Sequence, residues 1–268
     1  MSAVTLAFLL TALAYAVASG LYLAQLARGH VGAVTWAPRA FGVAIASHAV
    51  FLACDFALTG RMPTGDIRQA LALLSLLIAL AYLATMRRHR MTVLGAFLTP
   101  VALLLFLGAG LGASVPAVPE HVRSALLPLH VAVNVFGIAA FALAFAAALG
   151  YLVQERLLRQ KRVIGVFQRL PALDVLDAFG LKLVTLGFPL FTVGLVTGSL
   201  WAAQRASGVV SVTTGQGFAM LAWVCFGAVL LARVAAGWRG RRAAIGTLLG
   251  FACAMAAIVG YLLHGGGG

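Results

Sequence analysis

Eight long apolar runs divide this chain, and they constrain its fold more strongly than any motif it contains. A helix needs about 20 apolar residues to cross the hydrocarbon core of a membrane, and these runs have about that length. They are continuously apolar and do not alternate with a period of two, which predicts helices and not the strands of a membrane barrel. The pattern therefore predicts an all-α, polytopic membrane bundle of about eight transmembrane helices. The runs cover residues 3–27, 41–59, 70–86, 92–113, 129–153, 181–203, 215–235 and 243–263.

The composition agrees with this class of protein. Hydrophobic residues make up 63% of the 268-residue chain and charged residues only 9%, and the mean hydropathy is +1.05. A soluble domain cannot hide that much apolar surface from water. Residues 1–268 are therefore predicted to form a single integral membrane domain. We expect a multi-pass protein of a bacterial cytoplasmic (inner) membrane, in contact with membrane lipid.

The positive charges predict how the chain is oriented in the membrane. Loops rich in Lys and Arg stay in the cytoplasm, and the apolar runs place 15 of the 19 Lys and Arg residues on one side. Both termini are therefore predicted on the extracytoplasmic side, together with the loops near residues 64, 118 and 208. The four cations on that side are Arg61, Arg68, Arg123 and Arg205.

Charge and motifs also exclude some functions. The formal net charge of +13 is explained by this topology and by attraction to anionic lipid, so no nucleic-acid partner is expected. The six acidic residues are dispersed, and the chain has no phosphate loop, paired carboxylates or Ser/His/Asp arrangement. We therefore expect a protein that is not an enzyme and has no catalytic residue.

The connection at about 154–180 is the longest predicted on the cytoplasmic side. It carries Glu155, a basic stretch and then apolar residues at spacings of three and four, interrupted by Pro171. This pattern is typical of a kinked amphipathic helix that lies on the membrane interface. A simple solvated linker is the alternative.

An ionisable pair interrupts the second apolar run. His48 lies mid-span, and Asp55 follows seven residues later on the same helical face. Buried ionisable groups are costly in a membrane unless they are solvated or have a partner, so this face should point into the bundle. The pattern fits a ligand-binding or proton-handling role for His48, and it equally fits a hydrogen bond to a neighbouring helix.

Two more histidines, His130 and His264, lie at the predicted outer boundary of the fifth and eighth runs. Pro128 favours the first turn of a helix, which places His130 at that boundary with Asn134 on the same face. Two imidazoles at one membrane level are able to bind one iron from opposite faces of a haem. Two unrelated interfacial histidines are the alternative, because eight helices offer many chance coincidences.

The sixth run contains signs of a kink and of close packing. Pro189 leaves a backbone carbonyl without its helical partner, and Thr192 lies nearby to help satisfy polar backbone. Gly194 and Gly198 have the GxxxG spacing of closely packed membrane helices.

The second half of the chain resembles a known family. The resemblance is carried by LHVAVNVFGIAAFALA at 129–144, YLVQERLLRQKR at 151–162 and LPALDVLDAFGLKLVTLGFPLFTVGLVTGSLWA at 170–202. These segments are similar to the cytochrome c assembly membrane proteins of the CcsA/CcmC/HemX-like group. The plan of eight helices and the histidine in the second one resemble the HemX-like branch.

The resemblance implies a haem-handling membrane protein that assists cytochrome c maturation and binds haem near the outer membrane face. His130 and His264 would match the two outer histidines of the family, as ligands of the haem iron. His48 would match a further intramembrane histidine that binds the cofactor. Relatives hold the porphyrin with a loop rich in Trp and containing Asp, but the loop at 204–217 has neither residue here. The implied partners are haem and other cytochrome c assembly proteins.

Two other functions fit the same sequence. The first is a non-catalytic accessory or regulatory membrane protein of haem synthesis or cytochrome assembly, in which the basic segment at 155–176 engages a partner. The second is a small-solute transporter that uses the face of His48 and Asp55, although the chain has no convincing internal repeat.

Overall fold

The computed structural model describes residues 3–28, 31–60, 67–89, 91–111, 126–161, 165–205 and 213–264. These residues form helices and connecting turns, and no strand occurs among them. Eight of the helices are long and apolar enough to cross a membrane, which confirms the predicted all-α polytopic fold. The elements are α1 (Ala3–Arg28), α2 (Val31–Thr59), α3 (Ile67–His89), the 3₁₀ turn η1 (Thr92–Leu94), α4 (Gly95–Leu111), α5 (Leu126–Arg159), α6 (Val166–Arg169), α7 (Leu173–Arg205), α8 (Thr214–Ala236) and α9 (Arg241–His264).

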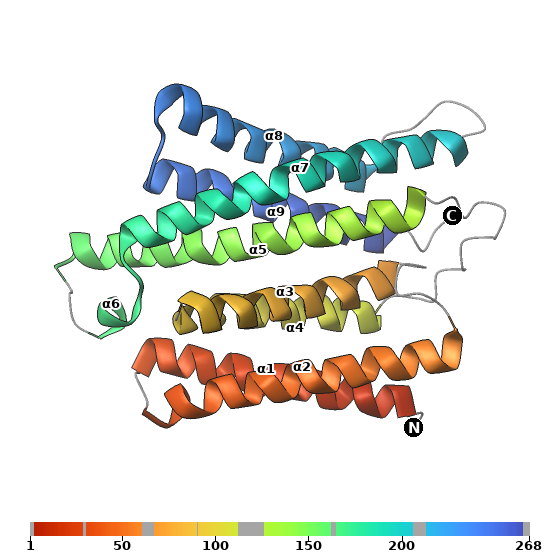
Figure 1. Ribbon diagram of the computed structural model, residues 1–268, viewed down its shortest axis with the longest axis horizontal. Helices are drawn as coiled ribbons and strands as arrows, with labels where there is room; N and C mark the ends of the chain where they lie inside the picture. The colour runs from red at the N-terminus through yellow and green to blue at the C-terminus, as the bar shows by residue number, and fades with distance from the viewer. Residues whose placement is uncertain are drawn as a thin grey trace.

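The long helices lie side by side, and consecutive ones run in opposite directions (Figure 1). Helix α1 contacts α2 and α4, and α3 contacts α4; on the other side α5 contacts α7 and α9, and α8 contacts α9. The contact between α3 and α5 joins these two groups of four helices. Because the number of long helices is even, α1 begins and α9 ends at the same end of the bundle. We call this the terminal end and the opposite one the loop end.

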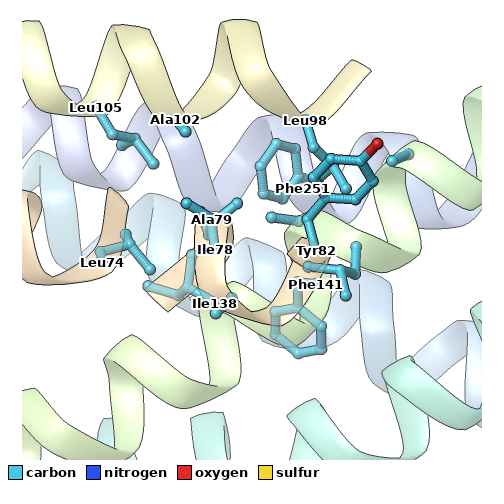
Figure 2. Close-up of a cluster of buried hydrophobic side chains, with 14 of the residues drawn as sticks. Leu74, Ile78, Ala79, Tyr82, Leu98, Ala102, Leu105, Ile138, Phe141 and Phe251 are labelled. Carbon is cyan, nitrogen blue, oxygen red and sulfur yellow. The ribbon is translucent and has the colours of Figure 1, made fainter. Parts of the chain in front are cut away.

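The apolar core includes the region where the two groups meet. Figure 2 shows Ile78 and Tyr82 of α3 beside Leu98 of α4, Phe141 of α5 and Phe251 of α9. All five side chains are almost fully buried. Helix α5 lies at the centre of this arrangement, since 61% of its most apolar stretch is buried, against 17% for α2. The many alanines of α5 between residues 139 and 148 allow helices to approach it closely from several sides.

The connection at 154–180 differs from the predicted kinked helix. Residues 154–159 continue α5, the one-turn helix α6 follows, and α7 already begins at Leu173. Pro171 disfavours helical geometry at the residue before it, which explains why the chain breaks there. Arg169 then folds back onto the C-terminus of α1, where its guanidinium donates to the carbonyl oxygens of Gln25 and Leu26 at 3.0 and 2.8 Å. Such a cation satisfies carbonyls that have no partner within the helix.

The membrane orientation of the bundle stays a prediction, and reporter fusions test it. An alkaline phosphatase domain fused to the C-terminus should be active, because that enzyme needs the oxidising extracytoplasmic side. The same domain inserted after Trp238, in the turn between α8 and α9, should be inactive because of the surrounding arginines. The reverse pattern of activities would contradict the predicted orientation.

Candidate functional site

Helices α5 and α7 approach each other so closely that their glycines are required. A Cβ at Gly187 would lie 3.0 Å from the carbonyl oxygen of Gly137, and a Cβ at Gly137 would lie 3.1 Å from the backbone nitrogen of Phe191. These are backbone atoms, which cannot rotate away as a flexible side chain does. The two helices therefore pack backbone to backbone at mid-span, and we call this contact the glycine seam.

Toward the terminal end of the bundle, the glycine seam makes room for polar side chains of α5. A Cβ at Gly198 would lie 2.5 Å from Cε1 of His130, and a Cβ at Gly194 would collide with the amide of Asn134. The predicted GxxxG pair of α7 therefore packs against two polar side chains of α5, with Gly194 against Asn134 and Gly198 against His130.

The His130 ring is held by several hydrogen-bonding groups. Its Nδ1 lies 2.8 Å from the carbonyl oxygen of Gly194 and 3.5 Å from the hydroxyl of Thr197. Because a carbonyl can only accept, the proton of a neutral ring is assigned to Nδ1, which donates to Gly194. Asn134 donates to the His130 carbonyl at 2.8 Å and places its amide nitrogen 3.1 Å from Nδ1 and 3.4 Å from Nε2.

This arrangement leaves Nε2 of His130 as the ring nitrogen with the lone pair, which has only the long 3.4 Å contact with the Asn134 amide. Histidines that bind metals almost always donate their other ring N–H to a backbone carbonyl or a carboxylate, which fixes the tautomer and orients the ring. Gly194 provides such a carbonyl, and the His130 side chain is half-buried. The residues around His130 therefore fit an axial ligand of haem iron.

The kink residues of α7 also have partners. The Thr192 hydroxyl donates to the Phe188 carbonyl at 2.8 Å and accepts from the indole N–H of Trp223 at 2.9 Å. Phe188 stacks on Trp223, with ring centroids 5.6 Å apart. These contacts join α7 to α8 one to two helical turns from His130.

His264 is the last residue of α9, at the same end of the bundle as His130 (Figure 1). Its side chain lies outside the described residues, so the predicted pair of axial ligands stays a prediction. The end of α9 is fixed nearby: a Cβ at Gly260 would lie 3.1 Å from backbone atoms of Gly215, and Tyr261 packs on the same glycine. Helix α9 also contacts α5.

His48 lies in a different and closed environment. Its Nδ1 is 3.1 Å from the Tyr15 hydroxyl, and its ring centroid lies 4.5 Å from that of Phe106 and 6.3 Å from that of Phe51. His48, Tyr15 and Phe106 are each 0% exposed. Its Nε2 has no hydrogen-bond partner among the described residues.

A porphyrin does not fit next to His48 in this packing. The free Nε2 has the chemistry of a ligand, but a side chain without exposed surface has no space beside it even for a water molecule. Haem binding by His48 stays a prediction that requires the surrounding aromatic rings to move. Asp55 does not join His48 but accepts from the Gln69 amide at 3.2 Å, so the predicted polar face divides between two separate partners.

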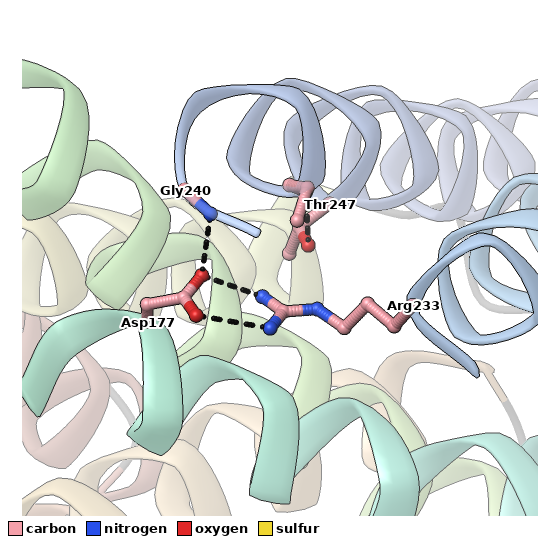
Figure 3. A network of polar contacts seen from close by, with 5 residues as sticks. Asp177, Arg233, Gly240 and Thr247 are labelled. Carbon is pink, nitrogen blue, oxygen red and sulfur yellow. Dashed lines mark hydrogen bonds and ion pairs between the residues drawn. The ribbon is translucent and has the colours of Figure 1, made fainter. Parts of the chain in front are cut away.

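Sequence reasoning missed the partners of the histidines and one ion pair. Asp177 of α7 accepts two hydrogen bonds from Arg233 of α8, at 2.7 and 3.0 Å, and a third from the Gly240 backbone at 3.0 Å (Figure 3). An acidic residue near the predicted cytoplasmic end of an apolar run was the available signal, because a membrane helix rarely carries one without a partner. Within the described part of the chain, no three His, Cys, Asp or Glu residues gather as a metal site.

Fold and site together define a polytopic membrane protein with a polar histidine site at one end of its central helix pair. Residues 64–265 match the family model described as Cytochrome C assembly protein, and the chain belongs to that family. This confirms the family predicted from the sequence, whereas the HemX-like branch stays a prediction.

Several relatives are named Cytochrome c biogenesis protein CcsA. The protein of Gloeothece citriformis is 27% identical and covers 84% of both chains, and that of Crocosphaera subtropica is 25% identical and covers 87% of this chain and 88% of its own. The protein of Synechocystis is 36% identical over a shorter part, 37% of this chain and 30% of its own. No solved structure matches the chain significantly.

The glycine seam makes a direct prediction for stability. Gly187→Leu should destabilise the protein by at least roughly 1–3 kcal/mol, because the added side chain meets backbone atoms of α5. Gly20→Leu is the matched control, since a Cβ there meets nothing within 4 Å. Thermal unfolding in detergent should show a clear loss for Gly187→Leu and almost none for Gly20→Leu. Equal melting temperatures would contradict the seam.

Proposed function

We propose that this chain handles haem in cytochrome c maturation, with His130 as an axial ligand at the terminal end of the bundle. The observation that carries the proposal is the hydrogen bond from His130 Nδ1 to the Gly194 carbonyl, which leaves Nε2 as the ring nitrogen with the lone pair. Membership of the cytochrome c assembly family and the names of the relatives support the same function.

In this proposal each residue of the site has a defined task. Bound haem supplies an iron that takes two axial nitrogen ligands. His130 offers one of them, Gly194 keeps its ring in one tautomer, and Gly198 leaves the space in which the ring stands. His264, at the end of α9, is the proposed second ligand.

The proposal assigns binding and presentation to the chain, not catalysis. Its setting is a bacterial cytoplasmic membrane, with the terminal end of the bundle on the extracytoplasmic side. Other assembly proteins are its proposed partners. Binding requires neutral imidazoles, because a protonated histidine has no lone pair for iron. Acidification should therefore release haem.

Absorption spectra of the protein purified with haem test this function. The wild type should give a six-coordinate, low-spin spectrum in both the oxidised and the reduced state. His130→Ala and His264→Ala should each lose that spectrum, because each removes one axial ligand. If both variants keep their bound haem, the assignment of these two ligands is overturned.

Two further variants separate ligation from packing. Gly198→Leu should act like His130→Ala, because the new side chain occupies the place of the imidazole. His48→Phe should keep the haem spectrum, because His48 lies in a closed aromatic core. If the haem spectrum is unchanged in Gly198→Leu and lost in His48→Phe, the haem site lies in the other half of the bundle.

A further inference from the structure

A pocket of about 500 Å³ opens at the loop end of the bundle, where α5 finishes and α8 turns into α9. Its lining includes the ring of Trp238 and four arginines: Arg159, Arg239, Arg241 and Arg242. All four arginines are exposed. The pocket lies at the opposite end of the bundle from His130.

Little negative charge balances these arginines. Glu155 is the one carboxylate paired with them among the described residues, at 2.9 Å from Arg159 and 3.9 Å from Arg241. No ion pair in the described ranges includes Arg239 or Arg242. The pocket therefore carries an excess of guanidinium groups, which bind phosphate and carboxylate in a bidentate manner.

The turn that presents the arginines is held in one conformation. Gly237 and Gly240 have φ angles of 63° and 65°, which glycine adopts without strain. The Gly240 N–H donates to Asp177, which also binds both terminal nitrogens of Arg233, as Figure 3 shows. A Cβ at Gly240 would lie 2.5 Å from the Tyr151 hydroxyl. Contacts from α5, α7 and α8 thus position this turn.

Two of the arginines lie at the start of α9, where Arg241 has only the 3.9 Å contact with Glu155 and Arg242 has no ion pair among the described residues. Arg241 and Arg242 are in the first turn of α9, which has no acidic residue. The N-terminus of a helix carries partial positive charge, so cations there are unfavourable and an anion is stabilising. A bound anion in the pocket would relieve both this repulsion and that among the arginines.

Apolar side chains continue from the pocket toward the membrane interior. Ile245 and Leu249 follow Arg242 on one face of α9 and are 40% and 57% exposed. On α8, Leu231 and Val234 are 68% and 88% exposed. A ligand with an anionic head and apolar tails matches this basic pocket and the apolar surface beside it better than a free anion does.

We propose that this pocket binds the phosphate headgroup of an anionic phospholipid, whose acyl chains lie along Ile245, Leu249 and Leu231. Basic pockets between membrane helices on the cytoplasmic side are known to bind such headgroups. Arg239 and Arg242 are the principal phosphate ligands, because Glu155 already engages the other two arginines. The site is independent of the proposed haem function.

Native mass spectrometry of the delipidated protein, titrated with phosphatidylglycerol or phosphatidylethanolamine, tests this proposal. The wild type should bind one phosphatidylglycerol more tightly than any phosphatidylethanolamine. Replacing two arginines, as Arg239→Gln with Arg242→Gln, should weaken phosphatidylglycerol binding by roughly 30-fold. Arg87→Gln with Arg88→Gln is the matched control, since it removes the same charge from exposed positions at the end of α3, and should leave the affinity unchanged.

Three outcomes would overturn the proposal. Equal weakening in both double variants would show that diffuse surface charge binds the lipid. Displacement of the lipid by millimolar inorganic phosphate would show a simple anion site. If iron protoporphyrin, and not phosphatidylglycerol, loses affinity in the Arg239→Gln/Arg242→Gln variant, the arginines bind haem carboxylates instead. Size-exclusion chromatography of both variants checks that the fold is retained.

Discussion

The close approach of α5 and α7 positions almost every functional group of this protein. Gly137 and Gly187 bring the two backbones together at mid-span, so closely that a Cβ at either position would press against backbone atoms of the other helix. That contact fixes the register of the helices along their whole length. At the terminal end it sets Gly198 and the Gly194 carbonyl against His130. At the loop end, α7 carries the Asp177 that holds the turn between α8 and α9.

The two ends of the bundle consequently differ in chemistry. The terminal end offers a histidine whose ring is oriented by backbone and small polar groups, without a charged residue among its recorded contacts. The loop end gathers arginines, one of which pairs with the half-buried carboxylate of Asp177 while others remain exposed. A neutral imidazole suits iron, and guanidinium suits phosphate. This separation would allow the proposed haem site and the proposed lipid site to be occupied without competition.

The sequence predicted the fold well because the length of an apolar run is a local property. All eight spans were found, although α5 and α7 extend well beyond their predicted ends. Arg156 and Arg159 mark the last turn of α5, where positive charge favours a helix and does not end it. The connection at 154–180 differs from the predicted kinked helix, since amphipathic spacing does not show that α5 continues to Arg159 or that α7 already begins at Leu173.

The site could be predicted only as single residues. Periodicity places His130 and His48 on helices and predicts how deep each lies in the membrane. The partner of each histidine, however, depends on how helices far apart in sequence align. His130 meets the Gly194 carbonyl 64 residues away, and His48 meets Tyr15 33 residues away. The resemblance to a family implied His130 and His264 as iron ligands and His48 as a further intramembrane histidine that binds the cofactor. Their packing distinguishes the half-buried His130 from the closed core around His48.

Haem is proposed to bind at the terminal end of the bundle, on the extracytoplasmic side. The most direct measurement uses right-side-out membrane vesicles that contain the haem-loaded protein, to which a reductant that cannot cross membranes is added. The account predicts that the spectrum of reduced haem appears at once and is unchanged by later permeabilisation of the vesicles. Reduction only after permeabilisation would place the haem at the cytoplasmic end and contradict the account.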